Sequence, residues 1–170
     1  MGIYKNLFIE VEEYLGDALN EGMTNEQAIK SVANEMFERK DIVFSMDEME
    51  SLGKWPLLAE LSINQNQSWT ESLDLVASGP LSESDGDIAL IAIGEIDDSE
   101  LKHLGQSLKE FLKDRKLIIT KDLREATKSS NLVVVTALGK TRNQELIDTR
   151  KMLLLQKKPI LGLVVINKLI

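Results

Sequence analysis

The stretch Leu132-Val133-Val134-Val135-Thr136-Ala137-Leu138 decides the fold class, because it is apolar along almost its whole length. A second run of this kind, Leu161–Ile166, follows after a segment of helical length. Strands that read as continuous apolar runs are typical of sheets covered by helices on both faces. Connections of helical length make such strands parallel, through right-handed crossovers. The sequence therefore predicts an α/β fold with an open, mostly parallel, doubly wound sheet.

The alternation of strands and helices extends outward from these two runs over residues 73–170. The pattern predicts strands at residues 73–78, 88–94, 116–120, 132–138 and 160–167, and helices at 98–113, 123–129 and 142–156. Upstream, acidic segments with an apolar face predict short helices, for which Thr24 and Ser45 begin capping boxes. A polar tract at 64–68 has the residues of a loop. We therefore expect an acidic helical unit at 1–53, a connector at 54–72 and an α/β domain at 73–170.

The composition excludes several kinds of chemistry. The chain has no cysteine and a single histidine, His103, so it has no disulfide framework, thiolate nucleophile or Cys-ligated metal. His103 lies in a predicted helix and is interpreted as a surface side chain rather than a catalytic base. Because acids interrupt the first apolar stretch, we expect neither a signal peptide nor a membrane span. The expected location is the cytoplasm.

The net charge of −8 is divided unevenly along the chain. Residues 1–100 hold 22 acidic and 5 basic side chains, whereas residues 101–170 hold 6 acidic and 15 basic ones. The two halves either neutralise each other within the fold or attract a partner or another copy of the chain. In the second case, homo-oligomers should dissociate as salt rises. The basic half has no Arg/Lys stripe interleaved with aromatic residues, so nucleic acid is not an expected partner.

The strand ends supply the candidate site, since ligands of open α/β sheets bind at the carboxyl ends of the strands. The turn Gly139-Lys140-Thr141-Arg142 is the strongest candidate. Lys140 and Arg142 place two cations beside the positive N-terminus of the next helix, which favours a nearby anion such as phosphate or an acidic partner. Thr141 is expected to cap that helix. A solvated turn with ordinary capping is the alternative.

The stretches Ser130–Arg142 (SNLVVVTALGKTR) and Pro159–Asn167 (PILGLVVIN) resemble the C-terminal part of the bacterial tyrosine kinases of capsule and exopolysaccharide biosynthesis. Those kinases are relatives of the MinD/ParA ATPases. Trp55–Leu61 (WPLLAEL) is similar to the segment that precedes their kinase domain. The resemblance implies a P-loop type of fold, contact of Asn167 with an adenine base, and a position for Asp122 at the strand end where such proteins hold Mg²⁺.

The chain departs from that family at the phosphate-binding loop. The corresponding segment, Ala77–Gly86, has no lysine, and acids at 83, 85 and 87 would repel a polyphosphate. The family's C-terminal tyrosine cluster is also missing, because the chain's tyrosines are Tyr4 and Tyr14. An active kinase is therefore not expected.

These observations favour a non-catalytic regulator or adaptor without a cofactor, acting by protein–protein interaction. The resemblance implies a partner in the polysaccharide assembly or export machinery. Two alternatives stay open. One is a nucleotide-binding protein or weak NTPase that holds ATP and Mg²⁺ at an unconventional phosphate site. The other is an acidic helical binding module of the phage or defence type, at residues 3–53, on an α/β scaffold.

Overall fold

The computed structural model describes residues 16, 22–30, 41–63 and 66–168. The chain divides into two compact units, residues 1–41 and 42–170. In the first unit residues 25–30 are helical, and the predicted capping box is confirmed. The Gln27 N–H donates to Thr24 Oγ1 at 3.3 Å, and the Thr24 N–H donates to Gln27 Oε1 at 3.2 Å. The apolar side chains that predict the first acidic helix, Leu7, Val11, Tyr14, Leu15, Ala18 and Leu19, lie outside the described residues.

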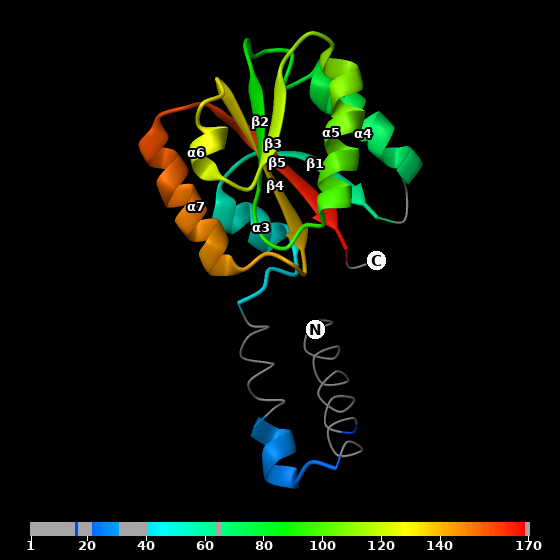
Figure 1. Ribbon diagram of the computed structural model, residues 1–170, viewed down its shortest axis with the longest axis vertical. Helices are drawn as coiled ribbons and strands as arrows, with labels where there is room; N and C mark the ends of the chain where they lie inside the picture. The colour runs from blue at the N-terminus through cyan, green and yellow to red at the C-terminus, as the bar shows by residue number, and fades with distance from the viewer. Residues whose placement is uncertain (1–15, 17–21, 31–40, 64–65, 169–170) are drawn as a thin grey trace. The chain divides into compact units, whose positions relative to one another are not determined.

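Five parallel strands form the sheet of the second unit, in the order β1-β5-β4-β2-β3 (Figure 1). The strands are β1 (Leu57–Ser62), β2 (Ile88–Ala92), β3 (Leu117–Thr120), β4 (Asn131–Leu138) and β5 (Ile160–Asn167). Every residue of β2 and β4 is buried, as expected for strands with continuous apolar runs. The predicted doubly wound α/β fold is confirmed.

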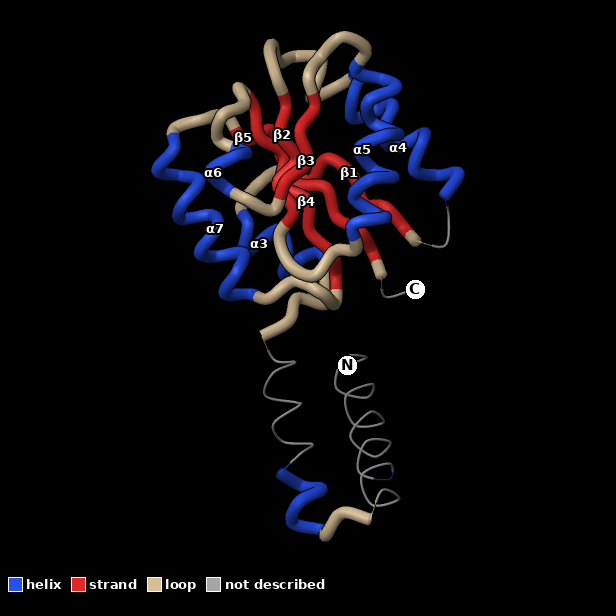
Figure 2. The backbone as a smooth tube through the Cα atoms, viewed as in Figure 1, coloured by secondary structure: helices blue, strands red, loops and turns tan. Residues whose placement is uncertain are grey.

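Helices cover both faces of this sheet (Figure 2). One face carries α4 (Asn66–Ser78) and α5 (Asp98–Leu112), and the other carries α3 (Met46–Gly53), α6 (Leu123–Ala126) and α7 (Asn143–Gln156). Each face has its own apolar core. Gly105 allows α5 to lie close to β3, since a Cβ at this position would clash with Ile119 Cδ1. No helix of the described residues is apolar over a length that would cross a lipid bilayer.

The sequence prediction is wrong at the start of the sheet. Residues 73–78, predicted as a strand, belong to α4, and the predicted connector at 54–72 contains β1 and the first part of α4. Trp69, Leu73 and Val76 are buried at helical spacing on α4. β1 begins directly after Pro56 and is an edge strand, where a proline is tolerated.

The boundary predicted at residue 53 also differs from the structure. Helix α3 begins at the predicted cap, with the Glu48 N–H donating to Ser45 Oγ at 3.2 Å. It ends at Gly53, as predicted, and Lys54 follows in the left-handed conformation with φ 53°. However, α3 belongs to the second unit, where it packs against α7. The sequence placed it with the acidic N-terminal helices because it shares their charge.

Candidate functional site

The winding of the chain changes direction between β2 and β4, which are neighbours in the sheet. From β2 the chain passes through α5 on one face to β3, whereas from β4 it passes through α7 on the other face to β5. Ligands of open α/β sheets bind in the crevice that such a switch point opens at the carboxyl ends of the two strands. The segments that follow β2 and β4 are therefore the candidate site.

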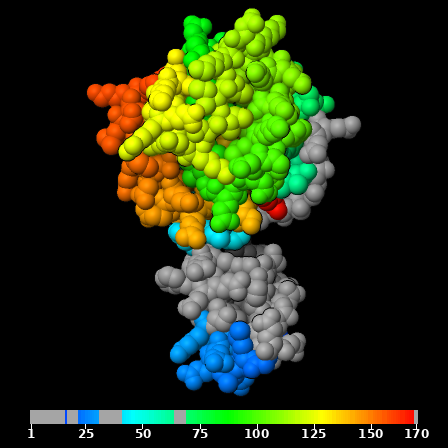
Figure 3. Space-filling view, viewed as in Figure 1, coloured from blue at the N-terminus to red at the C-terminus, as the bar shows by residue number. Residues whose placement is uncertain are grey.

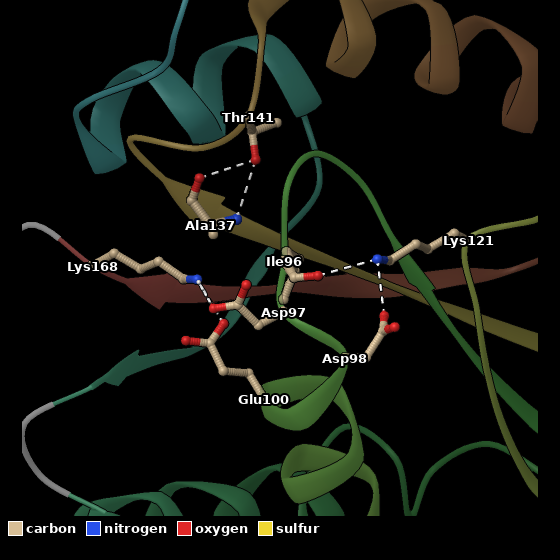
Figure 4. A network of polar contacts seen from close by, with 8 residues as sticks. All are labelled: Ile96, Asp97, Asp98, Glu100, Lys121, Ala137, Thr141 and Lys168. Atoms are coloured by element: carbon tan, nitrogen blue, oxygen red, sulfur yellow. Dashed lines mark hydrogen bonds and ion pairs between the residues drawn. The ribbon is translucent and has the colours of Figure 1, made fainter.

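The side chain of Thr141 fills this switch point. Its hydroxyl lies 3.2 Å from the carbonyl of Ile93 and 3.0 Å from that of Ala137, and it accepts the Ala137 N–H at 3.2 Å (Figure 4). Thr141 is completely buried. The predicted capping role of Thr141 is wrong, because the N-cap of α7 is Arg142, whose N–H donates to Glu145 Oε2 at 3.2 Å. Thr141 joins two strand ends instead of ending a helix.

The loop after β2 lies directly against this threonine. Gly94 has φ 88°, and a Cβ at this position would lie 2.6 Å from Thr141 Oγ1 and 2.7 Å from the Lys140 carbonyl oxygen. The Glu95 N–H donates to the same carbonyl at 2.9 Å. Only a glycine, with no Cβ, allows the two loops to come this close. The two loops therefore leave no space for a ligand between them at Thr141, and the hollow of about 280 Å³ beside Gly94 lies on the α7 side of β2.

The turn Gly139–Arg142 also has few main-chain donors left for an anion. The Gly139 N–H donates to the Val43 carbonyl at 2.8 Å, and the Lys140 N–H donates to the Ala137 carbonyl at 3.3 Å. The segment before α3 runs along this turn, with an antiparallel bridge between Ile42 and Arg142. With the Arg142 N–H bonded to Glu145, three of the turn's four amides are engaged within the protein. A backbone phosphate cradle is not supported here.

The side chains of Lys140 and Arg142 point to a different use of the turn. Both are exposed, and neither has a hydrogen-bond or ion-pair partner in the described part of the chain. They lie beside the N-terminus of α7, where positive charge is unfavourable. The turn therefore presents two uncompensated cations beside the switch point that Thr141 fills.

Two other lysines at this edge are neutralised. Lys168 Nζ lies 2.7 Å from Glu100 Oε2 and 3.2 Å from Asp97 Oδ2, and Lys121 Nζ lies 3.1 Å from Asp98 Oδ1 (Figure 4). Burial opposes the charge of Lys168, but the contacts with Glu100 and Asp97 outweigh it and raise the pKa of Lys168 above its ordinary value. No local sequence pattern shows these ion pairs, because the lysine partners of Asp97 and Asp98 are distant along the chain.

The other predicted site residues lie at the same edge of the sheet but have structural partners. Asn167 Nδ2 donates to Glu60 Oε1 at 2.7 Å, and Asp122 Oδ1 accepts the Arg124 N–H at 2.8 Å as the N-cap of α6. Two strands separate β5 from β3, so Asn167 and Asp122 are about 14 Å apart. The described residues contain no group of three or more His, Asp or Glu side chains that could hold a metal ion.

The segment Ala77–Gly86 does not correspond to a phosphate-binding loop. It connects helix α4 to strand β2, whereas a phosphate-binding loop connects a strand to a helix. It therefore lies at the amino edge of the sheet, away from the candidate site. Arg115 fixes it by donating from Nε to the Gly86 carbonyl at 2.9 Å and from Nη2 to Ser84 Oγ at 3.1 Å.

Comparisons of the chain with protein-family models, with curated proteins and with solved structures give no match. Support for a function therefore comes from the chain's own geometry, above all from the closed switch point and the exposed cations next to it.

Proposed function

We propose that the protein is a non-catalytic regulator or adaptor that acts by protein–protein contact at the carboxyl edge of its sheet. The closed switch point is the observation that carries this proposal. Proteins of this architecture that bind a small ligand hold it in the crevice between the diverging strands. Here the Thr141 side chain and the loop at Gly94 occupy that space. A switch point that is occupied by protein atoms suits the docking of a macromolecular surface better than the binding of a small ligand between the strands.

The charge of this edge indicates the chemistry of the partner. Lys140 and Arg142 are exposed beside the positive end of α7, so an acidic surface would relieve an unfavourable arrangement. Rim charges of this kind chiefly set the rate and the selectivity of association. The resemblance of residues 130–167 to the polysaccharide tyrosine kinases makes acidic components of the polysaccharide assembly or export machinery the first partners to test.

Changing Lys140 and Arg142 together to alanine should leave the melting temperature nearly unchanged or slightly raised, while weakening partner binding. The side chains are exposed and unpaired within the described residues, and their removal relieves repulsion at the α7 N-terminus. Thermal unfolding measures the first effect. Affinity capture from cells of the source organism, with the polysaccharide machinery quantified by mass spectrometry, measures the second.

A matched control for this experiment is Lys151→Ala with Lys157→Ala, which removes two exposed cations from the other half of α7 and its C-cap. The proposal expects a partner that the wild type and the control retain and the Lys140/Arg142 variant loses. Equal capture by all three proteins would contradict it. A loss of several kcal/mol in stability would show that Lys140 and Arg142 are structural.

A further inference from the structure

Strand β3 lies at the edge of the sheet, and no strand among the described residues pairs with its outer side. Ile88 of β2 is in register with Leu117, and its N–H donates to the Lys116 carbonyl at 3.0 Å. In a parallel ladder the bonds to one neighbour come from every second residue. The main-chain N–H and C=O groups of Leu117 and Ile119 therefore point away from β2. Such an edge is a template for a further strand.

A groove of about 420 Å³ runs beside this edge, between β3 and the first half of α5. It is lined by Asp98, Leu101, Lys102, Ile119, Thr120 and Lys121. Figure 3 shows this face of the molecule, with α5 in green to yellow-green and α6 in yellow. Strand addition takes its affinity from main-chain hydrogen bonds and its specificity from pockets for alternate side chains. At β3 the outward main-chain groups of Leu117 and Ile119 supply the first, and the groove beside Leu101 supplies a pocket for a side chain.

The charges around β3 indicate which strand would fit. Lys116 precedes the strand, Lys121 follows it, and Lys102 lies at the groove, all of them exposed. If two copies of the chain paired antiparallel through β3, the outward-facing Leu117 of one copy would pair with Ile119 of the other. In that register Arg115 of one copy would face Lys121 of the other, and like charges directly opposite are destabilising. This centred form of self-pairing is therefore disfavoured. Lys121 has a carboxylate partner in Asp98, whereas neither Lys102 nor Lys116 has an ion-pair partner among the described residues.

We propose that β3 binds an extended segment of a partner protein in which acidic residues flank a short run of apolar and β-branched residues. The segment adds to the sheet through the main chain of Leu117 and Ile119, and one of its apolar side chains lies in the groove beside Leu101. Its acids lie near Lys102 and Lys116. The proposal rests on the proposed function, since it names the kind of segment through which a partner binds, but it concerns a surface other than the 139–142 turn.

The test uses the full chain and a fluorescein-labelled peptide of four alternating valine and threonine residues with two glutamates at each end. Fluorescence anisotropy should show saturable binding. Lys102→Glu combined with Lys116→Glu should weaken this binding at least about tenfold, because two attractive contacts become repulsive. The matched control is Lys151→Glu on α7, at the opposite face of the sheet, with a side chain that is 71% exposed. It should bind the peptide as the wild type does.

Amide hydrogen exchange distinguishes strand addition from simple charge attraction. The peptide should slow exchange at Leu117 and Ile119, while the N–H of Ile118, which faces β2, is slow with or without it.

Three results would overturn the proposal. These are the absence of saturable binding at millimolar peptide, equal weakening by Lys151→Glu, and slow exchange at Leu117 and Ile119 without peptide in a protein of dimer mass. The peptide experiment involves no nucleotide. If the protein were found to bind a nucleotide, the proposed function would be contradicted, but the peptide result would still hold. Failure of the peptide would leave the Lys140/Arg142 contact intact.

Discussion

Replacing Gly94 with alanine should lower the free energy of unfolding by about 2 to 4 kcal/mol. The added Cβ would lie 2.6 Å from Thr141 Oγ1 and 2.7 Å from the Lys140 carbonyl oxygen, and the backbone at Gly94 has φ 88°. The loops after β2 and β4 would have to separate, which breaks the bond from the Glu95 N–H to the Lys140 carbonyl. Urea unfolding measured by circular dichroism gives the change.

The matched control for this substitution is Gly86→Ala. Gly86 has nearly the same φ, 89°, but the nearest atoms to its added Cβ are Ser130 Oγ at 2.8 Å, which can rotate away, and Ser130 Cβ at 3.1 Å, which has to shift only slightly. It should cost only the backbone strain, about 1 kcal/mol. If Gly94→Ala were as mild as Gly86→Ala, the two loops would not be in close contact in solution, and the switch point would be open.

Replacing Thr141 with valine should destabilise the protein by about 2 to 3 kcal/mol. Valine has nearly the same shape but cannot bond the Ile93 carbonyl or the Ala137 N–H, and these groups would be left buried without their partner. Thr141→Ser keeps the hydroxyl and loses one methyl group, so it should cost about 1 kcal/mol or less. The same urea series measures both variants. A neutral or stabilising Thr141→Val would mean that the hydroxyl does not join the strand ends.

Much of the fold follows from local sequence patterns. The apolar runs of β2, β4 and β5 and the helical spacing along α5 predict their elements nearly to the residue. The first strand and helix are missed for identifiable reasons. β1 starts after a proline at the sheet edge, and the polar residues at the start of α4 are typical of a loop. The placement of β1 beside β5 depends on pairing between the two ends of the unit, which no local pattern records.

The sequence predicts where the candidate site lies, but not whether its switch point is open or filled. Parallel strands necessarily bring the segments after β2, β3, β4 and β5 to one edge, so the location of the 139–142 turn follows from the strand pattern. That Thr141 points inward depends on its contact with Ile93, 48 residues earlier. The ion pair between Lys168 and Glu100 likewise joins distant parts of the chain. Whether a switch point is open or filled is therefore a property of tertiary packing.

The most direct test of the account is isothermal titration calorimetry of the full chain with ATP and with ADP, each with Mg²⁺, together with thermal unfolding at millimolar nucleotide. Because the switch point is filled, the account predicts no saturable heat and no rise in melting temperature, since only a ligand that binds the folded state raises it. Saturable binding of one nucleotide per chain, with a matching rise in melting temperature, would contradict the account and show that a nucleotide site exists in this protein.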